Sequence, residues 1–258
     1  MDIQRIPTFF INLDRDTFRR ELIEEELARA GLAGERLSAI EGRSVPDWLR
    51  SYYGCDLSDA EVGCSASHLV ICKRILERGL PYALTFEDDA HLAEHSRDII
   101  EAAIANAPQG WDVIRLIESS SQPFQALAEL GFGRSLVRYL RVPRSTTGII
   151  VSTAGARKLL SPRVIREPID VEIRWPWQLD LNVYGIEAPI VSQKSGVSLE
   201  STIPIRQRPK KFNQLQRLVF NVRKFGPADY LRCRFLGANV GVPASQPSFS
   251  AVPEASRT

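Results

Sequence analysis

Residues 82–90 read Tyr-Ala-Leu-Thr-Phe-Glu-Asp-Asp-Ala, an apolar run that ends in three carboxylates. The first five residues are mostly apolar and β-prone, which is typical of a buried parallel strand. Ligands of open α/β sheets collect beyond the carboxyl ends of the strands, so Glu87, Asp88 and Asp89 are expected where a substrate arrives. Adjacent acids repel one another unless a cation lies among them, and Mg²⁺ or Mn²⁺ prefers such oxygens. For this stretch alone, a solvated acidic turn is an equally good interpretation.

The residues before this stretch predict the opening of an α/β sheet. A buried strand is expected over residues 7–13, an amphipathic helix between residues 16 and 31, and a second strand over residues 36–40. This βαβ order is typical of nucleotide-binding sheets. Arg15 and Arg19 lie at the strand-to-helix turn, where they can hold a phosphate; the alternative is a solvated helix face.

A capping box predicts the helix that leads into the acidic stretch. Residues 58–61 read Ser-Asp-Ala-Glu, the Ser-x-x-Glu form, and Gly79 and Pro81 are stop signals. His68 lies on the polar face of this helix. There it contacts substrate or bonds a main-chain carbonyl, and the second role is the commoner one for a lone histidine.

Beyond the acids, the pattern continues to alternate between helices and strands. We expect helices over residues 98–107 and 153–160, and strands over residues 112–116, 147–152, 181–186 and 189–193. Arg115 interrupts an apolar run and predicts a carboxylate partner. Residues 118–144 are weakly periodic, so they are interpreted as a long irregular excursion that covers the site.

Acidic and aromatic residues meet again at residues 168–177. Asp170 and Glu172 precede Trp175 and Trp177. Sugar sites use this combination, because rings pack against C–H surfaces and acids accept hydrogen bonds from hydroxyls. Core anchoring by both tryptophans is equally compatible with the sequence.

Composition points to a globular α/β protein with a basic carboxyl-terminal segment. The chain has 258 residues and no run of 18 uncharged apolar residues, and its first residues do not resemble a signal peptide, so a cytoplasmic location is expected. The four cysteines are widely spaced, which predicts free thiols. Ten of the 33 basic and two of the 31 acidic residues follow position 205, so residues 1–205 carry a net charge of −6 and the remainder +8.

The basic segment predicts contact with something anionic. We expect a main domain over residues 1–205, a basic amphipathic tail over residues 206–242 and disorder over residues 243–258. Apolar residues recur at helical spacing in residues 210–225 between lysines and arginines, a form that lies peripherally on the inner membrane face. Docking on the acidic body is the alternative, and nucleic acid is not the expected partner.

The ordered motifs resemble glycosyltransferase family 25, which contains bacterial lipooligosaccharide and procollagen galactosyltransferases. They read Phe-Phe-Ile-Asn-Leu-Asp-Arg at 9–15, Ser-Ala-Ile-Glu-Gly at 38–42, Gly-Cys-Ser-Ala-Ser-His at 63–68, Phe-Glu-Asp-Asp at 86–89 and Thr-Gly-Ile-Ile-Val-Ser at 147–152. The resemblance spans about residues 7–205. It implies an α/β, Rossmann-like GT-A fold with a mainly parallel sheet, a UDP-sugar donor, usually UDP-galactose, and Mn²⁺ or Mg²⁺.

The same resemblance assigns roles to individual residues. Asp89 and then Glu87 are the expected metal ligands, and Asp88 faces the ribose or donor sugar. His68 lies near the donor or supports the acidic strand, and Gln193 and Ser195 line the metal end. The remaining residues expected to bind the nucleotide are Asn12, Leu13, Arg15, Arg19, Ala39 and Glu41.

Inversion in a single displacement needs a base that takes the acceptor hydroxyl proton. Asp170 is the expected base, with Glu172 in reserve, and a helix cap is the alternative role for Asp170. The resulting hypothesis is a metal-dependent inverting transferase that adds galactose to a glycan acceptor such as lipopolysaccharide core. The chain has no histidine after His95, which keeps open a catalytically inactive nucleotide-sugar-binding or scaffold protein. A two-metal phosphoesterase is disfavoured by the scarcity of histidines.

Overall fold

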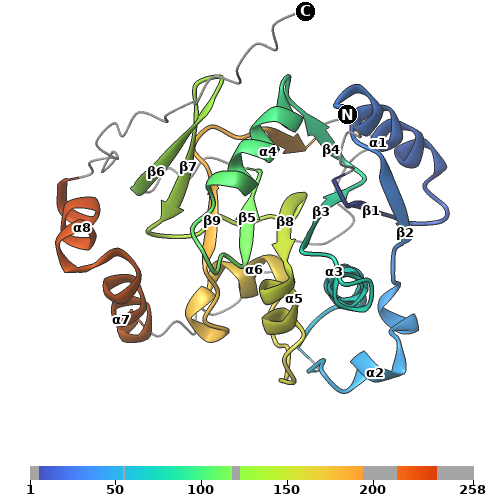
Figure 1. Cartoon of the computed structure of the whole chain (residues 1–258). Coiled ribbons are helices and arrows are strands. Elements are labelled where there is room, and N and C mark those ends of the chain that lie inside the picture. Colours follow the sequence, from blue (N-terminus) through green and yellow to red (C-terminus); the bar gives the residue numbers. More distant parts are fainter. Residues whose placement is uncertain (1–5, 55, 118–122, 194–213, 237–258) are drawn as a thin grey trace, which may run out of the picture.

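The computed structural model describes residues 6–54, 56–117, 123–193 and 214–236. Within them, a large twisted sheet runs through the centre with helices on both faces (Figure 1). Its strands are β1 (Thr8–Asn12), β2 (Gly34–Ser38), β3 (Tyr82–Glu87), β5 (Val113–Arg115), β6 (Phe124–Gly131), β7 (Arg134–Tyr139), β8 (Gly148–Ser152) and β9 (Val183–Ile186). A separate two-stranded ribbon pairs β4 (Ala90–Leu92) with β10 (Val191–Gln193).

The strand order is β2-β1-β3-β8-β5-β9-β7-β6, and the sheet is mixed. β1 pairs in parallel with β2 and β3, and β5 pairs in parallel with β9. β8 and β7 run against the other strands, so the remaining four ladders are antiparallel. The expected α/β class is confirmed, and the sheet is mixed with most strands in one direction. The parallel pairs are β2-β1-β3, which carry the site, and β5-β9.

The helices follow the predicted start and stop signals closely. Ser58 and Glu61 form the predicted capping box at the start of α3. Gly31 and Gly79, which follow α1 and α3, have positive φ angles as expected of helix-ending glycines. The helices are α1 (Thr17–Arg29), α2 (Asp47–Arg50), α3 (Asp59–Glu77), α4 (Ser96–Asn106), α5 (Thr153–Leu159), α6 (Ile169–Arg174), α7 (Gln214–Phe225) and α8 (Pro227–Leu231), with short helical turns η1 (Gly42–Ser44), η2 (Pro176–Gln178) and η3 (Arg232–Leu236).

Two hydrophobic cores cover the two faces of the sheet. Successive side chains of a strand point to opposite faces, so Phe9 and Ile11 of β1 join the core under α3 and α5, whereas Phe10 joins the core under α1 and α4. Both sides of the central strands are therefore buried. This burial leaves the strand ends as the places where polar groups can gather.

The interpretation of residues 118–144 as an irregular excursion was wrong where the structure describes them. Residues 123–144 contain β6 and β7, a hairpin that forms one edge of the sheet. Two register shifts break the alternation of β6, which is why its periodicity is weak. The turn residues Gly131, Phe132 and Gly133 all have positive φ angles.

Helix α7 contacts the body through one face only. Phe225 and Asn221 are buried, and the Asn221 side chain donates to the Leu140 carbonyl at 3.1 Å. Leu215 and Val219 remain 68% and 60% exposed. The amphipathic segment therefore docks on the body and also presents an apolar surface, and Phe225 belongs to the docked face. The domain boundary at residue 205 and residues 243–258 lie outside the described residues.

Candidate functional site

A pocket of about 390 Å³ lies beyond the ends of β1, β2 and β3. Its walls come from the β1–α1 turn, the segment after β2, the first turns of α3 and the acidic stretch after β3. The structure brings together in it all ten residues that the sequence assigned to nucleotide and metal: Asn12, Leu13, Arg15, Arg19, Ala39, Glu41, His68, Glu87, Asp88 and Asp89.

Parallel pairing is the reason that these distant segments meet. Ile11 pairs with Glu87, and Asn12 pairs with Ser38, so the three strands end at the same edge. The Ala39 amide then donates to the Asn12 carbonyl at 2.9 Å, which extends the sheet by one residue. As a result, the acidic stretch and the β1–α1 turn face one another.

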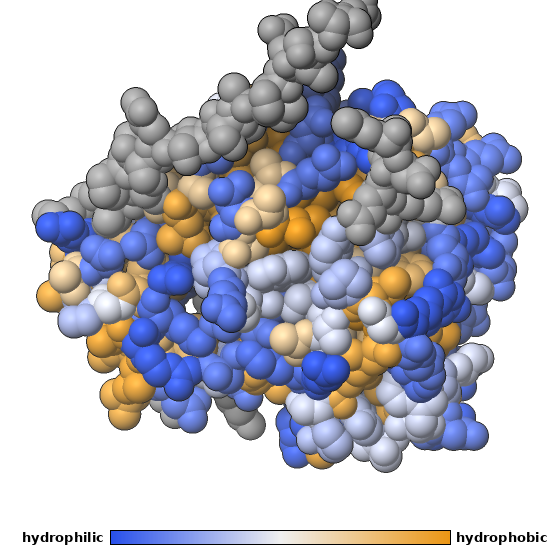
Figure 2. Space-filling model, viewed as in Figure 1, coloured by the Kyte–Doolittle hydropathy of each residue, from blue (hydrophilic) through white to orange (hydrophobic). Residues whose placement is uncertain are grey.

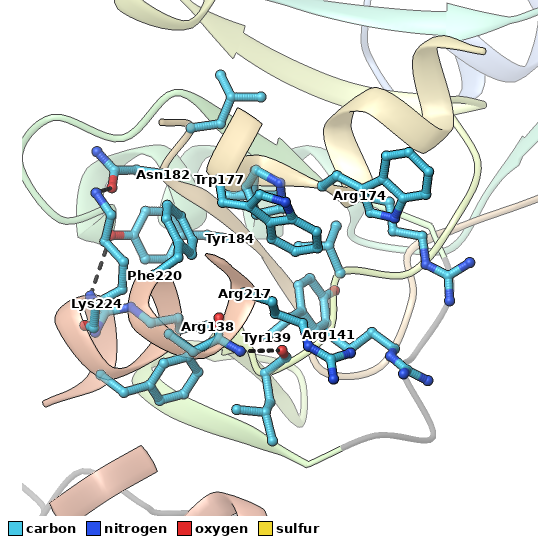
Figure 3. Close-up of a pocket in the computed structure, with 18 of the residues that line it drawn as sticks. Arg138, Tyr139, Arg141, Arg174, Trp177, Asn182, Tyr184, Arg217, Phe220 and Lys224 are labelled. Atoms are coloured by element: carbon cyan, nitrogen blue, oxygen red, sulfur yellow. Dashed lines mark hydrogen bonds between the residues drawn. The ribbon is translucent and has the colours of Figure 1, made fainter. Parts of the chain in front are cut away.

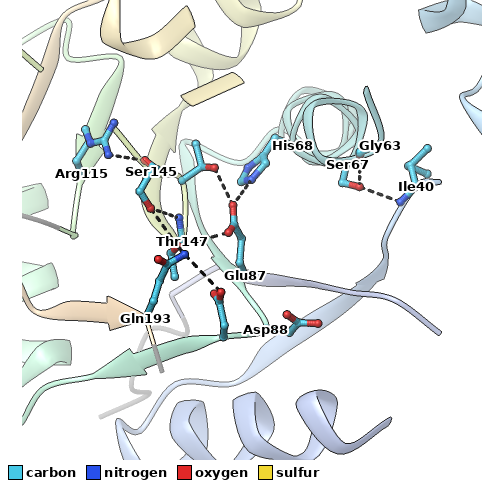
Figure 4. A network of polar contacts seen from close by, with 12 residues as sticks. Ile40, Gly63, Ser67, His68, Glu87, Asp88, Arg115, Ser145, Thr147 and Gln193 are labelled. Carbon is cyan, nitrogen blue, oxygen red and sulfur yellow. Dashed lines mark hydrogen bonds and ion pairs between the residues drawn. The ribbon is translucent and has the colours of Figure 1, made fainter. Parts of the chain in front are cut away.

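Close backbone packing joins α3 to the segment after β2. The Ser67 hydroxyl accepts a hydrogen bond from the Ile40 amide at 2.8 Å and donates to the Gly63 carbonyl, also at 2.8 Å (Figure 4). A Cβ at Gly63 would lie 2.3 Å from the Ile40 carbonyl oxygen, and a Cβ at Gly42 would lie 2.1 Å from the Asp59 carbonyl oxygen. Only glycine allows this approach. These two glycines therefore shape the nucleotide side of the pocket.

Glu87 is fixed by side chains from two segments, α3 and the residues just before β8 (Figure 4). Its Oε1 accepts a hydrogen bond from Thr146 at 2.7 Å and lies 3.3 Å from Nε2 of His68, and its Oε2 accepts from Thr147 at 3.4 Å. Burial opposes ionisation, but the contacts with His68 and the two threonines outweigh it and lower the pKa of Glu87. Glu87 is thus an ionised anchor between β3, α3 and β8.

Asp88 points away from Glu87 toward the β1–α1 turn (Figure 4). It accepts a hydrogen bond from the Asn12 amide at 2.8 Å and pairs with Arg19. Arg36 donates to the Asn12 side-chain oxygen at 3.1 Å, which leaves the amide group of Asn12 to face Asp88. Burial raises the pKa of Asp88, and the hydrogen bond from Asn12 and the charge of Arg19 offset this increase only in part.

Asp89 is the least satisfied carboxylate of the site. Its Oδ2 lies 3.6 Å from Arg19 and 3.4 Å from the Gln193 amide, whereas its buried Oδ1 has no hydrogen-bond partner among the described residues. Burial and the negative charge of Glu87 raise the pKa of Asp89 to about 7. A buried, unpartnered oxygen of this kind fits a divalent cation, which would supply the missing contact.

The two proposed bases have different surroundings. Asp170 is half-buried in the first turn of α6, and its negative charge acts on the Cys64 thiol in the pocket. Glu172 is buried and forms a two-pronged ion pair with Arg163, at 3.1 and 2.6 Å. Glu172 is therefore less available as a base than Asp170, because its carboxylate already pairs with the half-buried guanidinium of Arg163.

Sequence reasoning missed several residues of the site. Cys64 lines the pocket, and one ligand atom each from Cys64, His68 and Glu87 lies within 4.8 Å of the others. Burial, followed by the charges of Glu87, Asp170 and Asp89, raises the pKa of the Cys64 thiol well above its usual value. The spacing of Cys64 and His68 by four residues was the available signal.

Thr146 and Thr147 were also missed, because their role depends on a distant arginine. The guanidinium of buried Arg115 donates to the main-chain carbonyls of Arg144 and Ser145. These bonds fix the segment that presents both threonines to Glu87. The Gln193 side-chain amide donates to Asp89 at 3.4 Å and to the Thr147 hydroxyl at 3.0 Å. Ser195 lies outside the residues that the structure describes.

Comparison with known proteins identifies relatives over the part of the chain that builds this site. The family model described as "Glycosyltransferase family 25 (LPS biosynthesis protein)" matches residues 5–171. A protein of Haemophilus influenzae that carries the name of a glycosyltransferase is 27% identical over 64% of this chain and 60% of its own length. Procollagen galactosyltransferase 1-A of Xenopus laevis is 28% identical over 63% of this chain and 29% of its own length.

Not every relative is named as an active enzyme. The human "Inactive glycosyltransferase 25 family member 3" is 28% identical over 67% of this chain. The chain spans about a third of the length of these animal relatives and 60% of the bacterial one. Two solved structures overlap with this fold at low similarity: A197 from STIV, which covers 72% of this chain with a TM-score of 0.42, and a glycosyltransferase involved in glycosylation of the major capsid of PBCV-1, which covers 70% with a TM-score of 0.33.

Proposed function

Because the chain belongs to glycosyltransferase family 25, we propose that it is a GT-A-like, metal-dependent, inverting transferase that moves galactose from UDP-galactose to a glycan acceptor such as lipopolysaccharide core. One observation carries the proposal: ten residues from four separate segments converge on one pocket in which a buried oxygen of Asp89 has no partner among the described residues. The names of the galactosyltransferase relatives support galactose as the sugar.

Each wall of the pocket has a distinct task in this proposal. Asn12, Leu13 and Ala39 hold the nucleoside at the strand ends, while Arg15 and Glu41 pair at 2.8 Å on the exposed rim. Asp89 holds the metal ion, and Glu87 keeps the acidic stretch in place through its bonds to the threonines and His68. When bound, Mn²⁺ or Mg²⁺ stabilises the charge that develops on the departing diphosphate.

Asp170 is the group that removes the acceptor proton. Its carboxylate makes no hydrogen bond or ion pair with any residue that the structure describes, and it lies close enough to the pocket to act on Cys64. An unoccupied carboxylate can accept a hydroxyl proton, whereas Glu172 cannot do so without releasing Arg163. Attack of the acceptor oxygen on the far side of the sugar then inverts its anomeric carbon.

A nucleotide-binding protein without transferase activity is the second candidate, and Arg19 is the observation that favours it. The guanidinium of Arg19 already pairs with Asp88 and lies 3.6 Å from Asp89. If this cation takes the place of the metal, the nucleotide binds without Mn²⁺ and no sugar is transferred. The names of the inactive mammalian relatives agree with this alternative.

A thermal-shift titration with UDP, UDP-galactose, UDP-glucose and UDP-N-acetylglucosamine tests both candidates. A ligand that binds only the folded state raises the melting temperature. A shift that requires Mn²⁺ and is abolished by EDTA, followed by release of UDP in the presence of acceptor, supports the transferase. Equal shifts in EDTA without UDP release support the inactive protein, and no shift with any nucleotide contradicts both.

We also propose a peripheral location on the inner face of the cytoplasmic membrane. Among the described helices, none has the length and apolar character needed to cross a bilayer. α7 and α8 lie at the left of the molecule in Figure 1, and the same region of Figure 2 shows apolar patches among hydrophilic ones. α7, α8 and η3 expose Leu215, Val219, Leu231 and Phe235, and they carry several arginines. Apolar side chains flanked by basic ones bind anionic bilayers.

Sedimentation with vesicles tests this location. Vesicles that contain phosphatidylglycerol should bind the full chain, and pure phosphatidylcholine vesicles should bind it weakly. Leu215→Ser combined with Val219→Ser should release the protein, whereas Val164→Ser, which changes an exposed valine between α5 and α6, should not. Equal binding of both variants would contradict the assigned surface.

A further inference from the structure

A second pocket, of about 340 Å³, lies between α7, β7, β9 and the segment from α6 to η2. We call it the basic pocket, because none of the described residues that line it is acidic and six are basic (Figure 3). The six are Arg138, Arg141, Arg144, Arg174, Arg217 and Lys224.

The basic residues at the two ends of this pocket have different surroundings. Lys224 donates to the Asn182 side chain at 2.5 Å and lies 3.5 Å from Asp180, and Arg138 donates to the Lys224 carbonyl at 2.5 Å. At the other end, where the guanidinium groups of Arg141 and Arg174 lie (Figure 3), neither side chain has an acid within ion-pairing distance in the described ranges.

Positive charges lie close together at this end and lower the pKa values of neighbouring arginines. Burial, followed by the positive charges of Arg144 and Arg141, lowers the pKa of Arg174, and burial and Arg141 do the same for Arg217. Arg174 and Arg217 are half-buried, whereas Arg141 and Arg144 are exposed. Like charges gathered in one pocket, two of them partly desolvated, are unfavourable unless an anion joins them. The pocket therefore has the electrostatics of an anion site.

Aromatic rings give the same pocket a surface suited to sugars. Trp175 and Trp177 are half-buried and line it, so they are not the core anchors that the sequence also allowed. Indole faces pack against the C–H faces of sugar rings. A ligand with both a sugar ring and a negative charge would use both features.

Two connections link the basic pocket to the first pocket, which lies beyond the ends of β1, β2 and β3 and is called the donor pocket from here on. Arg144 lines the basic pocket, and two residues later Thr146 bonds Glu87. Asp170 and Arg174 lie at opposite ends of the short helix α6, about 6 Å apart along its axis. The charge of Asp170 acts on Cys64 in the donor pocket and on Arg174 in the basic pocket. Asp170 lines neither pocket, but it is adjacent in the chain to Val171, which lines the basic pocket.

We propose that the basic pocket is the acceptor subsite and that it selects glycans with an anionic substituent, a phosphate or a carboxylate. This inference rests on the proposed transferase function, since Asp170 must then act on the acceptor. Arg141, Arg144 and Arg174 hold the anionic substituent, Trp175 and Trp177 hold the ring, and a hydroxyl of the same glycan faces Asp170.

Calorimetric titration of the full chain with glucose 6-phosphate, glucuronic acid and glucose tests the subsite. The charged sugars should bind at least about tenfold more tightly than glucose, because hydrogen bonds to charged groups are the stronger ones. Arg141→Gln and Arg174→Gln should each weaken binding of the preferred charged sugar about tenfold, with glucose unchanged. Arg157→Gln, at an exposed position on α5 outside both pockets, is the matched control. Comparison of the two charged sugars separates phosphate from carboxylate.

Several outcomes would overturn this assignment. The first is equal affinity for charged and neutral sugars. The second is a loss of charged-sugar binding in Arg157→Gln as large as that in Arg141→Gln or Arg174→Gln. The third is tighter binding of a short single-stranded oligonucleotide than of either charged sugar. The Mn²⁺-dependent shift with UDP is measured on the same variants. If UDP binding is retained and sugar selectivity is absent, only the acceptor subsite is wrong. If UDP binding falls as much as sugar binding in Arg141→Gln, the basic pocket belongs to the donor.

Discussion

Oδ1 of Asp89 is buried without a hydrogen-bond partner in the described part of the chain, although Arg19 lies 3.6 Å from Oδ2 of the same carboxylate. The arginine therefore satisfies one side of Asp89 and leaves the other side available. The acidic stretch carries three different carboxylates: Glu87 is held ionised, Asp88 is bound by Asn12 and Arg19, and Asp89 has a pKa of about 7. This division of tasks leads to the first prediction.

Asp89→Asn should flatten the pH dependence of stability in the metal-free protein. The unfolded chain releases this proton near pH 4, whereas folded Asp89 retains it up to about pH 7. The folded state thus binds more protons between these values, so stability falls as the pH rises through this window, by up to about 4 kcal/mol. Urea unfolding in EDTA from pH 4 to 8 measures this loss. Asp47→Asn, at an exposed position, should retain it; equal slopes in all three proteins would contradict the assignment.

Mn²⁺ should reverse this loss above pH 7, because a cation favours the ionised form of Asp89. In the wild type, the melting temperature gained from Mn²⁺ should increase as the pH rises from 6 to 8. Asp89→Asn should show little gain at any pH. An undiminished gain in that variant would place the metal elsewhere.

Asp170→Asn should separate chemistry from donor binding. Loss of the base should reduce sugar transfer about 100-fold or more, because positioned general bases contribute at least that factor. The UDP-induced thermal shift should stay at the wild-type value. Glu172→Gln should instead reduce stability, since it leaves the half-buried guanidinium of Arg163 without its counter-charge, at a cost of about 1–3 kcal/mol of unfolding free energy. Kinetics and urea unfolding of both variants give the comparison.

Gly63→Ala should damage both the fold and the donor pocket. The added Cβ would lie 2.3 Å from the Ile40 carbonyl oxygen, so the segment after β2 must shift. We expect a loss of about 1–3 kcal/mol of unfolding free energy, together with weaker UDP binding. Gly54→Ala is the control, because its Cβ would meet only ordinary contacts of 3.5 Å or more. Wild-type UDP affinity in Gly63→Ala would show that this packing does not shape the pocket.

Thr146→Val should produce a pH-dependent loss of stability. It removes the 2.7 Å hydrogen bond to ionised Glu87, which is worth about 1.5–3 kcal/mol. Because the pKa of Glu87 is lowered in the folded state, its contribution is present above the ordinary carboxyl pKa and is lost as the pH falls through the folded-state pKa. The difference from wild type should therefore shrink in acid. Thr153→Val, which loses a bond to a neutral carbonyl, should show a constant difference.

The sequence predicted the donor half of the site well, because that half depends on local patterns. An apolar run followed by acids identifies β3 and its end, and Ser58 with Glu61 identifies the start of α3. Once three parallel strands are expected side by side, their ends must meet. The antiparallel β8 was identified as a strand, but its direction was not, since the pattern of a buried strand carries no direction.

The remaining part of the site depends on contacts between distant segments. Two bulges concealed the β6–β7 hairpin, and the carbonyl partners of Arg115 lie about 30 residues away along the chain. The different roles of Asp170 and Glu172 could be recognised only in the structure, because the position of Arg163 shows that Glu172 is the carboxylate in an ion pair. The basic pocket requires α7 to pack beside η2 and β9.

The sequence by itself determined β1, α1, β2, α3 and β3 in order, the acidic end of β3 and the family to which the chain belongs. Periodicity, caps and turn residues are local, so they can be recognised without knowing what packs against them. Tertiary structure decided which carboxylate has an unsatisfied oxygen among the described residues, which one is available as a base and where the arginines of the basic pocket converge. Burial and charge neighbours set those properties, and both are fixed only when segments far apart in the chain come together.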